Sequence, residues 1–170
     1  MGNGPYPGLT MKLVDNFSLR LIKEPIPEKN LHGEYEVLIG GNTTGIHVPY
    51  CVIEAAVKVD AERYLIFLTN DTLFEEMLRI VLIHPGKGIL ECLVLGSVYL
   101  AGFFEELDVQ ASVIIFKFLG DKIWSVRIPD KPFFRIPFLG DPRGVWRPFA
   151  LKHHILISAN PLPARADGSR

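Results

Sequence analysis

Five histidines are the residues of this chain best suited to metal binding or proton transfer. They are His32, His47, His84, His153 and His154. Only the last two are neighbours, and adjacent residues of a strand point to opposite faces, so they cannot easily share a metal ion. Neither His-x-His nor His-Glu-x-x-His occurs. The histidines therefore predict no metal site and no cofactor, and they favour no particular catalytic residue.

Three other short motifs resemble reactive sites without matching them. Pro85-Gly86-Lys87-Gly88 lacks the Ser or Thr and the upstream glycine of a phosphate-binding loop, and it reads as a hairpin turn. Ser97 follows Gly96 directly and so lies outside a Gly-x-Ser-x-Gly elbow. The carboxylates of residues 105–108 form an acid/base pair only in principle, since such runs are usually solvated. An enzyme is therefore not the favoured interpretation, although the sequence leaves the question open.

The two cysteines, Cys51 and Cys92, both lie within apolar runs, and no Cys-x-x-Cys occurs. We expect reduced structural thiols, with a disulfide only if their strands are neighbours. The first residues lack the basic and apolar regions of a secretory signal. Together these features predict a cytoplasmic protein.

Residues 130–149 mix aromatic and cationic side chains, the types that dominate binding hot spots. The candidate partner-binding residues are Phe133, Phe134, Arg135, Arg143, Trp146 and Arg147. In the alternative interpretation the aromatic side chains cover the open end of the fold and the arginines pair with acidic residues elsewhere. Single-stranded nucleic acid, which also binds interleaved aromatic and basic residues, is the least favoured partner.

A second candidate partner-binding feature is apolar and then acidic, and consists of Phe103, Phe104, Glu105 and Glu106. We expect residues 103–108 to form an exposed loop.

Charge is divided unevenly along the chain. Residues 1–121 carry nine Lys/Arg and sixteen Asp/Glu, whereas residues 122–170 carry nine and three, and the sum is the net charge of −1. This division predicts either ion pairs across the fold or one basic face for an acidic partner.

Most of the chain has the patterns of β-strands. Apolar residues alternate with polar ones over 17–21 and 35–39, and 50–59 and 63–69 read as a hairpin whose second strand is buried on both faces. Residues 40–45 read as a flexible loop. Residues 111–118 and 123–128 read as a hairpin around a type II′ turn at Gly120-Asp121, and 153–158 as the last strand.

Residues 77–128 contain the densest apolar sequence. A helical turn at 72–76 followed by a strand at 77–84 fits the pattern, although a helix throughout is an alternative. The longest uncharged run within this region, residues 92–104, is too short for a transmembrane helix. We interpret this region as the sheet core.

These patterns predict an all-β fold, an antiparallel sandwich or flattened barrel of about eight to nine strands with little helix. Residues 11–158 would form a single domain between a loose arm (1–10) and a tail (159–170). The favoured function is a non-catalytic soluble protein-binding module, similar to an adaptor or inhibitor, with the immunity proteins as one example of the type. The alternatives are a β-sheet pocket that binds or transforms an apolar small molecule, and a structural protein that self-assembles, or dimerises, through edge strands.

Overall fold

The strands of this protein form four antiparallel sheets in the computed structural model, which describes residues 10–70, 77–97, 102–136 and 140–161. The strands are β1 (Lys12–Val14), β2 (Phe17–Lys23), β3 (Glu34–Ile39), β4 (Asn42–Val48), β5 (Val52–Lys58), β6 (Tyr64–Thr69), β7 (Leu78–His84), β8 (Gly88–Leu95), β9 (Glu105–Val109), β10 (Ile114–Lys117), β11 (Ile123–Arg127), β12 (Phe133–Phe134), β13 (Val145–Trp146), β14 (Lys152–His153) and β15 (Leu156–Asn160). One 3-10 turn, Pro27–Lys29, is the only helical element in the described ranges.

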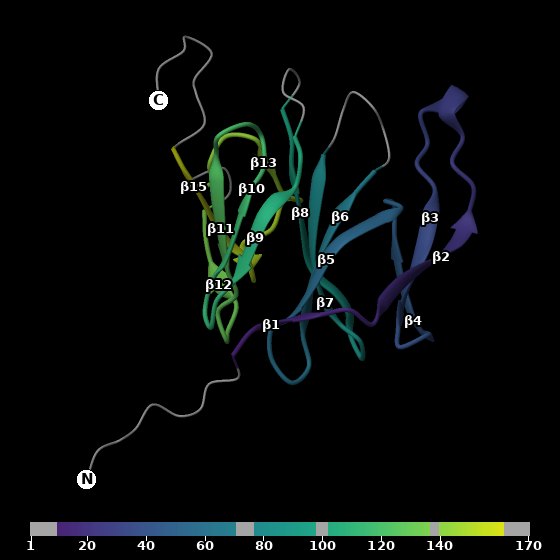
Figure 1. Cartoon of the computed structure of the whole chain (residues 1–170), viewed down its shortest axis with the longest axis horizontal. Coiled ribbons are helices and arrows are strands. Elements are labelled where there is room, and N and C mark those ends of the chain that lie inside the picture. Colours follow the sequence, from purple (N-terminus) through teal and green to yellow (C-terminus); the bar gives the residue numbers. More distant parts are fainter. Residues whose placement is uncertain (1–9, 71–76, 98–101, 137–139, 162–170) are drawn as a thin grey trace.

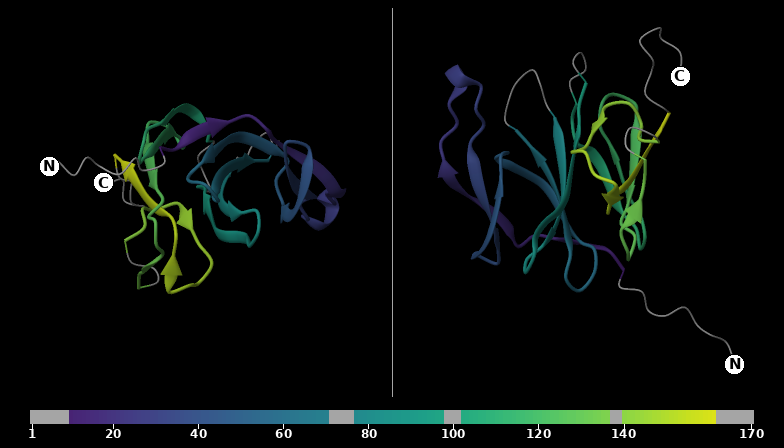
Figure 2. Two further views of the ribbon diagram at one scale, coloured as in Figure 1. Left: turned by 90° about the horizontal axis from the view of Figure 1, so that it is seen from below. Right: turned by 180° about the vertical axis from the view of Figure 1, so that it is seen from behind.

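Three of the sheets are stacked in layers (Figures 1 and 2). The central sheet has the order β1-β5-β6-β7-β8-β13, the C-terminal sheet β15-β11-β10-β9, and the N-terminal sheet β2-β3-β4. The fourth sheet is the pair β12-β14. No sheet closes on itself within the described residues, so the sandwich is confirmed over the barrel.

The central sheet is buried on both faces, and β6 shows how. Leu65 and Phe67 belong to the core shared with the C-terminal sheet, whereas Ile66 and Leu68 belong to the core shared with the N-terminal sheet. Successive side chains of a strand point to opposite faces, so a strand between two apolar layers must be apolar throughout. This confirms the prediction for residues 63–69.

Several predicted strands are confirmed with small shifts. The strand predicted at 77–84 is β7 (78–84), which pairs with β8 across the turn at 85–87, and β5 pairs with β6 as a hairpin. The predicted helical turn at 72–76 lies outside the described residues. Fifteen strands exceed the eight to nine expected, partly because four of them have only two or three residues and escape periodicity analysis.

Residues 40–45 are not the loop that we expected. Gly40 and Gly41 both take positive φ angles, 57° and 80°, which suits a two-residue hairpin turn whose twist matches the flanking strands. Pairing therefore resumes at once, with Ile39 opposite Asn42. Gly45, at φ 72°, lies within β4 where the register with β3 shifts.

Residues 103–108 are also not an exposed loop. Residues 105–109 form β9, the edge strand of the C-terminal sheet, and the ring of Phe104 lies 5.2 Å from those of both Phe67 and Phe116. The acidic residues obscured this strand in the sequence, because its solvent face carries the charges while Leu107 and Val109 pack against the core.

The turn between β10 and β11 differs in type from the prediction. Leu119 and Gly120 both take positive φ angles, 63° and 74°, and the N–H of Phe118 donates to the carbonyl of Lys122 (3.3 Å). A type II′ turn centred on Gly120-Asp121 would need a positive φ at its first central residue, Gly120, only. In the observed turn the side chain of Leu119 is buried.

The predicted last strand, 153–158, is two strands, β14 and β15. Strand pairing is interrupted between them because the N–H groups of His154 and Ile155 donate to the carboxylate of Glu91 and not to a neighbouring strand. β15 continues to Asn160, two residues past the predicted domain boundary. Residues 1–9 and 162–170, most of the predicted arm and tail, lie outside the described ranges.

Both cysteines are free thiols and half-buried. Burial raises the pKa of the Cys92 thiol, although the nearby guanidinium of Arg79 opposes this effect. Within the described ranges, no helix combines the length and apolar character that a membrane crossing requires.

Candidate partner-binding surface

The segment from residue 128 to residue 155 joins the C-terminal sheet to one edge of the central sheet. β12 pairs with β14, Phe133 opposite His153, and β13 pairs with β8, Val145 opposite Leu95 and Trp146 opposite Val94. Five prolines between residues 129 and 149 restrict ladder pairing. These short strands are therefore held to the body of the protein largely by side chains.

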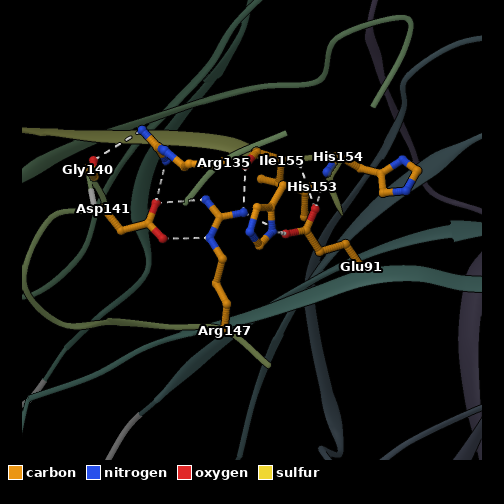
Figure 3. Close-up of polar contacts among 8 residues, drawn as sticks. All are labelled: Glu91, Arg135, Gly140, Asp141, Arg147, His153, His154 and Ile155. Atoms are coloured by element: carbon orange, nitrogen blue, oxygen red, sulfur yellow. Dashed lines mark hydrogen bonds and ion pairs between the residues drawn. The ribbon is translucent and has the colours of Figure 1, made fainter. Parts of the chain in front are cut away.

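Glu91 of β8 is the centre of that attachment (Figure 3). Its Oε1 atom accepts from Nη1 of Arg147 (2.6 Å) and lies 2.9 Å from Nδ1 of His153. Its Oε2 atom accepts the N–H groups of His154 and Ile155, the latter at 2.9 Å. A carboxylate whose two oxygens accept four donors is satisfied despite its burial.

Arg147 is equally well satisfied. Asp141 accepts from its Nε and Nη2 atoms at 2.8 and 2.9 Å, and the carbonyl of Ile155 accepts from Nη1 at 2.7 Å. The same aspartate accepts from Nη1 of Arg135 (3.0 Å), whose Nη2 lies 3.4 Å from the carbonyl of Gly140. We call Glu91, Arg135, Asp141, Arg147 and His153 the ion-pair cluster.

A pocket of about 230 Å³ lies over the ion-pair cluster. Its lining consists of Arg135, Ile136, Asp141, Pro142, Val145, Trp146, Arg147, Pro148, Phe149, Ala150 and His153. Three apolar side chains on its rim are strongly exposed: Ile136 (69%), Trp146 (68%) and Phe149 (75%). We call this feature the anchor pocket. It combines charged groups that are paired within the cluster with apolar side chains that are largely exposed.

His153, which lines the anchor pocket, belongs to one pair that resembles a catalytic arrangement. The pair His153–Glu91 has the arrangement of an oriented base, but the lining residues include no Ser, Thr, Cys or Lys that could act as a nucleophile. Among the described residues, no group of three or more His, Cys, Asp or Glu side chains is placed to hold a metal ion.

The structure separates the six predicted partner-binding residues. Phe134 and Trp146 are exposed apolar side chains, and Arg143 is an exposed cation. Arg135 lines the anchor pocket. Arg147 is buried in the ion-pair cluster, and the Phe133 ring lies 6.1 Å from that of His153. The positions of Arg147 and Phe133 fit the interpretation in which this segment covers the core. Those of Phe134, Trp146 and Arg143 fit a partner-binding surface.

The second predicted feature is divided in the same way. Phe103 is exposed, whereas Phe104 packs into the core as described above. Glu105 and Glu106 are exposed on edge strand β9, and Glu106 forms an ion pair with Lys117 (2.8 Å). The lining of the anchor pocket contains no residue of this feature.

Sequence reasoning missed Glu91 and Asp141, and it considered His153 only as a possible metal-binding or catalytic residue. One signal was available for Glu91, which is the single charge in the run Ile89 to Phe104, since a charge inside a core strand needs a buried partner. The sequence did not indicate that its partners would lie 56 and 62 positions away.

His154 lies beside this cluster, and its pKa is lowered. Burial lowers its pKa, and the positive charges of Arg63, Lys152 and His153 act in the same direction against Glu91. Its neutral form is therefore favoured in the folded protein.

Comparisons with protein-family models, curated proteins and solved structures found no match for this chain.

Proposed function

We propose that this chain is a non-catalytic protein-binding module, similar to an adaptor or an inhibitor, and that the anchor pocket and its rim contact the partner. The observation that carries the proposal is the exposure of Ile136, Trp146 and Phe149 around one pocket. Tryptophan and other large side chains beside a pocket are typical of interface hot spots. Exposed apolar surface concentrated at one place is costly for a monomer unless it is used.

The ion-pair cluster supports this function by holding the rim in place. Arg147 follows Trp146 directly, and its guanidinium is fixed by Glu91, Asp141 and the Ile155 carbonyl. A rim that is already ordered loses little conformational entropy when a partner binds, and this raises affinity.

Pocket size favours a protein partner over a small molecule. Sites for drug-sized ligands have volumes of about 300–1,000 Å³, whereas the anchor pocket has about 230 Å³. This space suits one side chain of a larger partner whose remaining contacts lie on the rim.

The test is site-specific photo-crosslinking in an extract of the source organism. A photoreactive residue at Trp146 should capture a defined protein, which is then purified and titrated against the wild-type chain. Trp146→Ala and Phe149→Ala should each weaken that binding by about tenfold or more.

Leu13 provides a matched control, because it is an exposed apolar residue on β1, at the opposite edge of the central sheet. Leu13→Ala should leave the affinity unchanged. Equal loss of binding in all three variants, or no loss in any, would refute the proposed surface. Capture of a second copy of the chain would favour self-assembly instead.

A further inference from the structure

We propose that the partner presents an acidic segment with one apolar or aromatic side chain, and that this side chain enters the anchor pocket. This inference rests on the proposed function and specifies the chemistry of the partner. It follows from the charges that remain after the ion-pair cluster is complete, and from the volume and lining of the pocket.

The stretch of chain that supplies the pocket lining is basic, and the exposed Asp130 lies just before it. Residues 131–161 carry five Lys/Arg residues and a single acidic one, Asp141. That aspartate is fully engaged by Arg135 and Arg147, and Glu91, which the central sheet contributes, is engaged by Arg147 and His153. Both nearby carboxylates are therefore occupied within the cluster.

Three cations of the same segment remain exposed: Lys131, Arg143 and Lys152. None of them forms an ion pair with a described residue. Arg143 follows Pro142, and Lys152 precedes His153, and both of these neighbours line the anchor pocket. Exposed cations one residue away from lining positions complement a partner that carries carboxylates beside an apolar residue, and they accelerate and orient its approach.

The pocket has room for the proposed side chain. An apolar cavity of about 150 Å³ is enough to hold benzene, so a pocket of about 230 Å³ accommodates a phenyl ring or a leucine side chain. Pro142, Val145, Pro148 and Ala150 provide apolar lining. The paired charges of the cluster need no further partner from the ligand, so an uncharged anchor leaves nothing unsatisfied.

Single-stranded nucleic acid fits the observations less well. It binds where stacking aromatic side chains follow a continuous basic groove, whereas Arg135 and Arg147 are already paired with carboxylates. Of the remaining cations, Arg143 and Lys152 are each next in sequence to a residue that lines a compact pocket. An acidic peptide is therefore favoured over nucleic acid, and the experiment below distinguishes the two.

The experiment uses the full chain and displayed random peptides of about a dozen residues as the probe. Peptides selected on the wild-type chain are synthesised, and their affinities are measured by fluorescence anisotropy. We expect them to share one large apolar residue flanked by Asp or Glu. Trp146→Ala and the double variant Arg143→Glu/Lys152→Glu should each weaken binding by about tenfold or more, and added salt should weaken it further.

Lys12→Glu/Lys29→Glu is the matched control, because both lysines are exposed, lie outside the 131–161 segment, and change the net charge by the same amount. It should leave peptide affinity nearly unchanged. Circular dichroism and urea unfolding of every variant would show that the fold is retained, so that a loss of binding reports on the surface.

The outcomes separate the inference from the proposed function. Peptides that need Trp146 but carry no acidic bias and tolerate the Arg143/Lys152 reversal would overturn the acidic partner and leave the surface intact. If Trp146→Ala leaves the affinity of the selected peptides unchanged, or if no peptide is enriched at all, the proposal that a partner side chain enters the anchor pocket is wrong. Binding of a fluorescent oligothymidylate strand, abolished by Trp146→Ala, would replace the acidic peptide with nucleic acid.

Discussion

Arg147 and Glu91 form an ion pair between the proline-rich segment and the central sheet, with Nη1 and Oε1 2.6 Å apart and side chains only 6% and 9% exposed. The two residues are 56 positions apart in the chain. Figure 3 shows this pair within the ion-pair cluster. Arg147 also lines the anchor pocket and directly follows the exposed Trp146, so a buried ion pair fixes the backbone beside the exposed indole.

Glu91→Ala should be strongly destabilising. It leaves a buried guanidinium with one carboxylate fewer and removes the acceptor of two backbone N–H groups. Loss of one partner of a buried pair costs about 3–5 kcal/mol. Urea unfolding would measure this as a lower midpoint, and the exposed Glu28→Ala should have little effect. A change of similar size in both variants would contradict the assignment.

The two tryptophans allow the rim to be examined separately from the core. Trp124 is fully buried and its indole donates to the Phe118 carbonyl (2.8 Å), whereas Trp146 is 68% exposed. The emission of Trp124→Phe should therefore be red-shifted and readily quenched by acrylamide. Trp146→Phe should leave blue-shifted, protected emission. Equal quenching in the two variants would show that Trp146 is covered.

Much of the fold could be predicted because strand patterns are local. Alternation located β2 and β3, and the uninterrupted apolar run of β6 indicated a sheet covered on both faces. The candidate site was less accessible, because it depends on pairing between distant positions. Aromatic and arginine composition directed attention to residues 130–149, but only the fold distinguishes exposed Trp146 from Arg147, whose side chain is buried.

Gly45 should resist substitution although its surroundings are open. No heavy atom lies within 4 Å of a Cβ added there, so the cost comes from its φ of 72°. Gly45→Ala should cost about 1–2 kcal/mol, whereas Gly45→Asn should cost less, because asparagine tolerates the left-handed region. Thermal unfolding of both variants would measure the difference. Equal stability of Gly45→Ala and the wild type would contradict the conformation of β4.

His154 should make the protein less stable as the solution becomes mildly acidic. Because burial lowers its pKa, the unfolded chain binds this proton more readily than the folded one. This contribution to stability is complete above about pH 6.5, the ordinary pKa of histidine, and is lost as the pH falls toward the folded pKa. His154→Gln should reduce the difference in urea midpoint between neutral and mildly acidic buffer. If the variant keeps the same difference in urea midpoint as the wild type, the pKa of His154 is not lowered in the folded protein.

Glu36 should govern a separate loss of stability at lower pH. The N–H of Gly45 lowers the pKa of this carboxyl by donating to Oε2 (2.9 Å), and the Arg20 guanidinium acts in the same direction, while desolvation partly opposes them. The folded protein therefore holds this carboxyl ionised at pH values where the unfolded chain protonates it. The resulting stability is present above about pH 4.3, the ordinary pKa of glutamate, and is lost as the pH falls through the folded pKa.

Glu36→Gln should flatten the acid limb of the stability profile, whereas Glu28→Gln on the exposed 3-10 turn should retain it. If the two variants lose stability in parallel with the wild type, the β3–β4 contact does not control this transition.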